Sequence, residues 1–281
     1  MMLPPHVRRG DPVPGRRSSS LGGLTVAAAA LVGMLLLAGC GGTASDDGGT
    51  GASLDPDSRL HARPSAGGRS CRAGVHELRV DGGRRALMRV APGGLSRAHP
   101  FLLALHGANS GGAPGGLWAF RGAWKLPGLV IVAPSAAGST WTLGRTDIAL
   151  VDRALRFAFR RCAVDRRRVG VGGFSAGAGL ALWLGLTNGD LFHSVTALSG
   201  GGSLPTARIG APVVFLAHGT QDSVIPIAEG GDELARRLRS EGYAVTYRRF
   251  RGGHRVVPAI ARAGVRQALY ERYLETYVST G

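Results

Sequence analysis

Short apolar runs alternate along this chain with longer segments in which apolar residues recur at helical spacing. Runs such as 101–105 and 129–133 are continuously apolar, which is typical of strands buried on both faces. After Asp147, apolar side chains recur every three or four residues from Val151 to Phe159, and this spacing predicts an amphipathic helix. Buried strands that alternate with helices predict an α/β fold with a mainly parallel central sheet and helices on both faces. The predicted strands cover residues 75–80, 86–91, 101–105, 129–133, 168–172, 193–198, 213–217 and 244–250, and the predicted helices follow Asp147 and Ser175 and cover 228–240 and 257–277.

The first forty residues have the pattern of an export signal rather than of a folded domain. Arginines at positions 8, 9, 16 and 17 precede an apolar stretch, 24–38, that is shorter than the roughly twenty residues needed to span a bilayer. The stretch ends in Leu37-Ala38-Gly39-Cys40, which resembles the lipobox of bacterial lipoproteins. The resemblance implies that residues 1–39 are a signal peptide and that Cys40 is acylated, which would anchor an exported lipoprotein to a membrane of the cell envelope. An ordinary signal peptide and an uncleaved anchor are the alternatives.

The segment that follows Cys40 is low in large apolar residues. Residues 40–70 are rich in Gly, Ser, Thr, Asp and Pro, a composition that predicts a flexible tether. The folded domain is predicted to cover residues 71–281 as a single unit, because the candidate functional residues fall at successive strand ends of one sheet.

Beyond Cys40 the chain has two cysteines, Cys71 and Cys162. An even pair in an exported protein favours a disulfide between them. The alternative is that Cys162 is a buried free thiol, because it continues the apolar face of the helix that contains Val151 and Leu155. Two cysteines at this separation do not form a zinc pattern, and we expect no metal and no organic cofactor.

The charge of the chain raises nucleic acid as a partner. The formal net charge is +16 at pH 7, and Lys125 is the only lysine. The arginines are scattered, however, and no run of them is interleaved with aromatic residues, so we expect no nucleic-acid partner. The basic residues are interpreted as a solvated surface, and attraction to an acidic envelope surface or an acidic substrate is the alternative.

The chemistry of the chain centres on Gly173-Phe174-Ser175-Ala176-Gly177. A β-branched run enters this G-x-S-x-G pattern and an apolar helical pattern leaves it, which is the strand–turn–helix context of a nucleophilic serine. In such a turn the serine adopts a strained backbone, and glycine two residues to either side avoids a collision with the neighbouring strand or helix. Ser175 is therefore the candidate nucleophile.

A serine hydroxyl needs a base to remove its proton, and the base needs an acid to orient it. In the order Ser, Asp, His, the acid is predicted to be Asp222, in the loop after strand 213–217. The base is predicted to be His254, in the loop after the last strand. Three roles at the ends of strands of one sheet predict a Ser175–His254–Asp222 catalytic triad.

Two backbone N–H groups are predicted to stabilise the oxyanion that forms when an acyl carbonyl is attacked. One belongs to Ala176, directly after the nucleophile, and the other to Ala108, in the loop after strand 101–105. His106 and His218 both stand at strand ends, and we interpret them as structural residues that hydrogen-bond their loops.

From about residue 98 to 273 the chain resembles α/β-hydrolase esterases of the phospholipase/carboxylesterase, polyhydroxybutyrate-depolymerase and feruloyl-esterase groups. The residues that carry the resemblance are Leu105-His106-Gly107, the segment 173–177, His218-Gly219-Thr220-Gln221-Asp222 and Gly252-Gly253-His254. The resemblance implies the α/β-hydrolase fold and hydrolysis of carboxylic esters through an acyl-enzyme without a cofactor. The stretch 199–212 leaves no room for a cap domain, so we expect an open cleft, which favours bulky or polymer-linked esters. A serine peptidase on the same fold and a catalytically silent envelope-binding lipoprotein are the alternatives.

Overall fold

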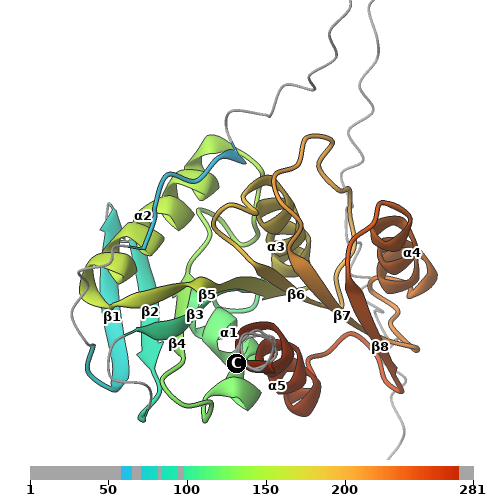
Figure 1. Cartoon of the computed structure of the whole chain (residues 1–281). Helices are drawn as coiled ribbons and strands as arrows, with labels where there is room; N and C mark the ends of the chain where they lie inside the picture. Colours follow the sequence, from blue (N-terminus) through green and yellow to red (C-terminus); the bar gives the residue numbers. More distant parts are fainter. Residues whose placement is uncertain (1–57, 65–70, 82–83, 94–97, 272–281) are drawn as a thin grey trace, which may run out of the picture. The chain divides into compact units, whose positions relative to one another are not determined.

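The computed structural model describes residues 58–64, 71–81, 84–93 and 98–271 (Figure 1). The predicted signal peptide 1–39, Cys40, most of the predicted tether and residues 272–281 lie outside the described residues. Within the described part of the chain, no helix combines the length and the apolar character that a membrane crossing requires.

The domain is built on one eight-stranded sheet with the strand order β1-β2-β4-β3-β5-β6-β7-β8. β1 and β2 form a hairpin, and β2 also pairs antiparallel with β4. All the remaining neighbours are parallel, so the carboxyl ends of β3, β5, β6, β7 and β8 meet at one edge of the sheet. The strands are β1 (Gly74–Asp81), β2 (Arg84–Val90), β3 (His99–Leu105), β4 (Val130–Pro134), β5 (Val164–Phe174), β6 (Ser194–Leu198), β7 (Val213–Gly219) and β8 (Val245–Phe250).

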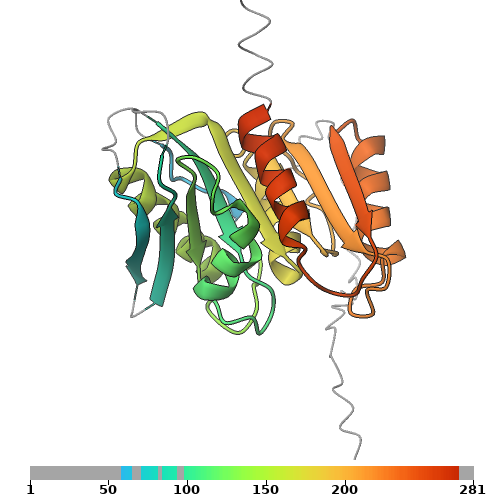
Figure 2. The same ribbon diagram turned by 90° about the horizontal axis from the view of Figure 1, so that it is seen from below.

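Helices cover both faces of the sheet, as the alternation of elements predicts. α2, α3 and α4 supply residues such as Leu155, Leu182 and Leu238 to the hydrophobic core on one face. α1 and α5 cover the other face, where Leu117 and Val265 belong to a second core (Figures 1 and 2). The helices are α1 (Ala113–Ala119), α2 (Arg145–Arg161), α3 (Ala176–Thr187), α4 (Glu233–Ser240) and α5 (Pro258–Arg266). This three-layer arrangement is the α/β-hydrolase fold.

Helix α1 is the element that the apolar pattern does not predict. It follows a pair of glycines, its second residue is Pro114, and it has only seven residues. Proline in the first turn is compatible with helix initiation, because its missing N–H would have no partner there. The helix forms because Leu117 and Ala119 are buried against the sheet, which is a tertiary effect.

A segment of the predicted tether belongs to the folded domain. Residues 58–64 lie against α2 and α3, with Leu60 and Ala62 buried. The carboxylate of Asp152 accepts hydrogen bonds from the backbone N–H groups of His61 and Ala62, each at 2.7 Å. Asn188 accepts from the N–H of Leu60 at 2.8 Å and donates to the carbonyl oxygen of Ser58 at 3.0 Å. Residues 58–64, which the sequence assigns to the tether, are therefore packed on the domain that it predicts to begin at residue 71.

Ion pairs reinforce the attachment of this segment. Both Arg59 and Arg63 contact the carboxylate of Asp190, which lies just beyond the end of α3. Burial alone would raise the pKa of Asp190, but the two guanidinium groups outweigh it and hold that pKa below its usual value. Because these groups are partly exposed, solvent weakens the pairs, and the buried backbone bonds contribute more to the attachment.

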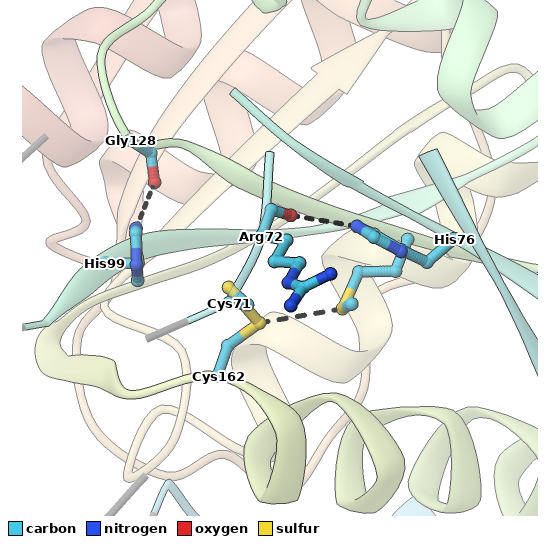
Figure 3. The surroundings of a disulfide bond; sticks show 7 residues. Cys71, Arg72, His76, His99, Gly128 and Cys162 are labelled. Atoms are coloured by element: carbon cyan, nitrogen blue, oxygen red, sulfur yellow. Dashed lines mark hydrogen bonds between the residues drawn. A yellow bond between two sulfur atoms is a disulfide. The ribbon is translucent and has the colours of Figure 1, made fainter. Parts of the chain in front are cut away.

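A disulfide joins Cys71 to Cys162 across 91 positions of sequence (Figure 3). Cys162 is the residue at which α2 ends, and it is also fully buried, in contact with Met88 of β2. The predicted disulfide is therefore present. Cys162 is not a free thiol, although it is buried in the core as that alternative expected. The bond ties the chain just before β1 to the end of α2.

We expect the double substitution Cys71→Ala and Cys162→Ala to lower the free energy of unfolding by about 2–4 kcal/mol, because the cross-link restricts the unfolded chain. Urea unfolding of the oxidised protein and of the variant measures the difference. Dithiothreitol should destabilise the parent protein and leave the double variant unchanged. An equal effect of the reductant on both proteins would show that the disulfide is not the cause.

Candidate active site

The sharp turn between β5 and α3 carries Ser175 at the carboxyl edge of the sheet. Ser175 has φ 56° and ψ −122°, a left-handed conformation that L-residues adopt rarely. A Cβ atom on Gly173 would lie 2.1 Å from the carbonyl oxygen of Gly177, and one on Gly177 would lie 2.4 Å from the carbonyl oxygens of Leu105 and His106. The collisions expected from the sequence are therefore present, and glycine is required at both positions.

The imidazole of His254 lies between the other two predicted residues of the triad. Its Nε2 is 2.8 Å from Oγ of Ser175, and its Nδ1 is 2.8 Å from Oδ2 of Asp222. The three side chains come from the loops or turns that follow β5, β7 and β8, which lie at the same edge of the sheet. In this geometry Nδ1–H donates to the carboxylate, and the lone pair of Nε2 accepts from the serine hydroxyl.

The carboxylate of Asp222 is held by its own loop as well as by His254. Its Oδ1 accepts hydrogen bonds from the N–H groups of Val224 at 3.0 Å and Ile225 at 2.9 Å. Burial alone would raise the pKa of Asp222, but the N–H of Ile225, the imidazole of His254 and the N–H of Val224 outweigh it and lower that pKa. Asp222 is thus ionised at neutral pH, with one oxygen fixed by the backbone and the other directed at His254.

His218, near the end of β7, contacts the loop that carries Asp222. Its Nε2 lies 2.9 Å from the carbonyl oxygen of Ile225 and 3.3 Å from Oδ2 of Asp222, so an N–H on this nitrogen points toward both acceptors. Its Nδ1 is buried without a hydrogen-bond partner among the described residues. Gly230 and Gly231 pack closely on this side chain: a Cβ on Gly230 would lie 2.6 Å from Cε1 of His218, and one on Gly231 would lie 2.7 Å from its Cβ. This position matches the structural role that the sequence predicts.

The loop after β3 lies beside the nucleophile, as the second predicted oxyanion donor requires. A Cβ on Gly107 would lie 3.4 Å from Cβ of Ser175 and 3.0 Å from the ring of Phe174. In the described part of the chain, neither the N–H of Ala108 nor that of Ala176 has a hydrogen-bond acceptor. Both residues are at least partly accessible to solvent. N–H groups without an internal acceptor are available to stabilise an oxyanion, and Ala176 and Ala108 stay the predicted donors.

His106 fixes the loop that carries Ala108. It is buried, its Nδ1 donates to the carbonyl oxygen of Gly107 at 2.8 Å, and its Nε2 accepts from the N–H of Ala136 at 3.0 Å. Burial lowers the pKa of His106, although the bond to Gly107 and the charge of Asp147 partly oppose this. Both ring nitrogens are satisfied only in the neutral form, which supports the structural role expected from the sequence.

Two features of the site were not predicted. The ring of Phe174, the residue before Ser175, packs against the imidazole of His254, with 4.9 Å between the two ring centroids. The hydrogen bonds from the N–H groups of Val224 and Ile225 were not predicted, because the sequence does not show how this loop folds around the carboxylate of Asp222. Among the described residues, no cluster of His, Cys, Asp and Glu could hold a metal ion.

The neutral state of His106 predicts a pH dependence of stability. Because its pKa is lowered in the folded state, the unfolded chain binds more protons below about pH 6.5, and the free energy of unfolding falls as the pH falls from that value toward the folded pKa. His106→Gln should be less stable at pH 7.5 but lose less stability between pH 7.5 and 5.5, measured by urea unfolding. His193→Gln, at an exposed position, is the control and should keep the parent slope. Equal slopes for the parent and His106→Gln would contradict this role.

The chain is similar to known proteins both in sequence and in structure. Residues 145–262, a range that contains Ser175, Asp222 and His254, match the family model of phospholipases and carboxylesterases. The solved structure of esterase PE8 is similar over 64% of this chain and 97% of its own, with 22% identity and a TM-score of 0.52. Fluorophosphonate-binding serine hydrolase F from Staphylococcus aureus is similar over 70% of this chain and 99% of its own, with 12% identity and a TM-score of 0.58.

A ferulic acid esterase from the anaerobic fungus Anaeromyces mucronatus is similar over 74% of this chain and 94% of its own, with 16% identity and a TM-score of 0.53. Among curated proteins, none matches this sequence significantly. At these identities the solved structures establish the fold, and the matched segment adds a similarity in sequence over part of the chain. The chain therefore has the α/β-hydrolase fold, and over residues 145–262 it is similar to the phospholipases and carboxylesterases.

Proposed function

We propose that this chain hydrolyses carboxylic esters through an acyl-enzyme on Ser175, with His254 as general base and acid and Asp222 as its orienting partner. The observation that carries the proposal is the pair of 2.8 Å contacts of the His254 imidazole, one to the serine hydroxyl and one to the carboxylate. A serine hydroxyl bonded to the lone pair of a neutral imidazole is activated for attack on an acyl carbon.

In the first half of the reaction, Oγ of Ser175 attacks the ester carbonyl while Nε2 of His254 takes the hydroxyl proton. The carbonyl oxygen becomes an oxyanion, which accepts hydrogen bonds from the N–H groups of Ala176 and Ala108. Asp222 stabilises the imidazolium and keeps Nδ1 protonated. His254 then delivers its proton to the leaving alcohol, and the acyl group remains on Ser175.

In the second half, water replaces the alcohol and His254 removes a proton from it as it attacks the acyl-enzyme. The same two N–H groups hold the second oxyanion. When this intermediate collapses, His254 returns the proton to Oγ of Ser175 and the carboxylic acid leaves. Every proton passes through one imidazole, so these steps require neither a metal nor an organic cofactor.

We further propose that the substrate is a bulky or polymer-linked ester. Residues 199–212 join the carboxyl end of β6 to the start of β7, and within this described stretch there is no helix or strand. A site without a cover accepts substrates that extend into solvent. The ferulic acid esterase among the structural neighbours is, by its name, an enzyme for an aromatic acyl ester.

We also propose that the chain is exported and anchored in a membrane of the cell envelope through acylated Cys40. Support comes from the arginines, the apolar stretch and the Leu37-Ala38-Gly39-Cys40 sequence in register. The folded domain begins by residue 58, so residues 41–57 would form the remaining link between the lipid and the domain.

The catalytic proposal is tested by Ser175→Ala and His254→Ala. Hydrolysis of p-nitrophenyl butyrate should fall by about three orders of magnitude or more in each variant, because these residues act as one unit. A fluorophosphonate probe should label the parent protein at Ser175 and leave Ser175→Ala unlabelled. Matched controls are Ser223→Ala and His193→Ala, which alter exposed side chains and should retain parental rates. Parental activity in Ser175→Ala, or no ester hydrolysis by the folded parent protein, would contradict the proposal.

The anchoring proposal is tested by Cys40→Ser in the full chain expressed in a bacterium. The parent protein should enter the detergent phase of a Triton X-114 extract, because each buried CH2 of an acyl chain adds about 0.8 kcal/mol to membrane binding. Cys40→Ser should remain in the aqueous phase. Mass spectrometry of the mature N-terminus provides the second readout, and an unmodified Cys40 in the parent protein would contradict acylation.

A further inference from the structure

A pocket of about 320 Å³ opens directly beside Ala176, the predicted oxyanion donor. One wall is the outer face of α3, with Leu180 and Trp183, and the second is the loop after β4, with Trp141 and Leu143. The third is formed by residues 201–203. The catalytic steps described above use Ala176 alone among these residues, so the rest of the pocket has no role in the chemistry.

The pocket follows the axis of α3 away from the nucleophile. Ala176, Leu180 and Trp183 share one face of the helix, and at 1.5 Å per residue the distance from Ala176 to Trp183 is about 10 Å. Gly179 and Gly202 line the pocket and leave it open because they have no side chains. A Cβ on Gly179 would lie 3.0 Å from the carbonyl oxygen of Gly201. The space therefore runs from the predicted oxyanion site to an indole ring.

The position of the pocket identifies the part of the ester that would enter it. The leaving alcohol must lie within reach of Nε2 of His254, which protonates it. The residues that line the pocket include none from the loops that carry His254 and Asp222. The acyl group stays bonded to Ser175, next to Ala176, and so it is the half of the substrate that can extend along α3.

The chemistry of the walls favours an apolar, flat group. None of the lining residues is charged, and two of them are tryptophans. Trp141 is held in place by a 2.8 Å hydrogen bond from its Nε1 to the carbonyl oxygen of His106. Nε1 of Trp183 is buried without a partner among the described residues. Trp183 therefore contributes through its ring surface, and rings of this kind favour aromatic partners in stacked or edge-to-face contact.

We propose that this pocket is the acyl-binding site of the enzyme and that it selects flat aromatic acyl groups, such as benzoyl and cinnamoyl, with Trp183 as a specificity-determining residue. This inference rests on the proposed esterase function. A volume of about 320 Å³ is at the small end of the range for ligand pockets, which suits one acyl group rather than a whole lipid.

The test compares kcat/KM for p-nitrophenyl acetate, octanoate and cinnamate in the parent protein and in variants of the pocket. Trp183→Ala should lower kcat/KM for the cinnamate by about tenfold and leave the acetate within about twofold, because acetyl does not reach the indole. Trp183→Phe keeps an aromatic wall and should retain most of the activity on the cinnamate. Trp118→Ala is the matched control, since Trp118 is an exposed tryptophan on α1 outside the pocket, and it should change neither rate.

A second variant closes the pocket from the opposite wall. Ser203 is exposed, and Ser203→Phe should lower kcat/KM for the cinnamate by about tenfold while the acetate is hydrolysed at the parent rate. If Trp183→Ala or Ser203→Phe lowered kcat/KM equally for the acetate and the cinnamate, the substitution would be acting on the fold as a whole. That result would overturn the assignment of the pocket. A larger loss on octanoate than on cinnamate in Trp183→Ala would overturn the aromatic preference. A loss on 2-naphthyl acetate, whose aromatic group is the alcohol, without a loss on the cinnamate would overturn the acyl assignment.

Failure of this inference is separable from failure of the proposed function. Ser175→Ala should abolish hydrolysis of all these esters whichever group the pocket receives. If the parent protein hydrolyses the acetate through Ser175 but the pocket variants have no selective effect, only the acyl-pocket assignment falls.

Discussion

The close packing of the turn at Ser175 against the end of β3 is the constraint on which the site depends. Gly177 lies so near the backbone of Leu105 and His106 that even one methyl group would overlap their carbonyl oxygens. This contact brings the start of α3 against the end of β3, next to the loop that carries Ala108. The strained backbone of Ser175 is held by hydrogen bonds around it, including the 3.0 Å bond from its own N–H to the carbonyl oxygen of Leu198.

Electrostatics around His254 depend on groups that are themselves fixed by backbone contacts. Asp222 stays ionised because N–H groups of its own loop and the imidazole together outweigh the effect of burial on its pKa. Two other histidines, His106 and His218, hold the loops that carry Ala108 and Asp222. Three histidines thus occur at this edge of the sheet, and only His254 lies within hydrogen-bond distance of the serine hydroxyl among the described residues.

Helices α2 and α3 are stabilised by long-range contacts with the segments that precede β1. Residues 58–64 bind to the middle of α2 and to the end of α3 through Asp152, Asn188 and Asp190. The Cys71–Cys162 disulfide then ties the chain to the end of α2. Both connections hold the helices that follow β4 and β5, and α3 is the helix whose first residue is Ala176.

Much of this molecule was already determined by local sequence. Continuous apolar runs predict the strands because both faces of a parallel sheet are buried, and the glycines around Ser175 indicate a turn that no larger residue can form. The order of Ser175, Asp222 and His254 at strand ends predicts their meeting because parallel strands share one edge. Features that depend on contacts between distant segments could be decided only by the tertiary structure. They include the folding of α1, the attachment of residues 58–64, the backbone donors to Asp222 and the pocket in front of Trp183. Each of these joins residues whose individual patterns are weak, and burial against partners far away in the chain supplies the free energy that local propensity does not.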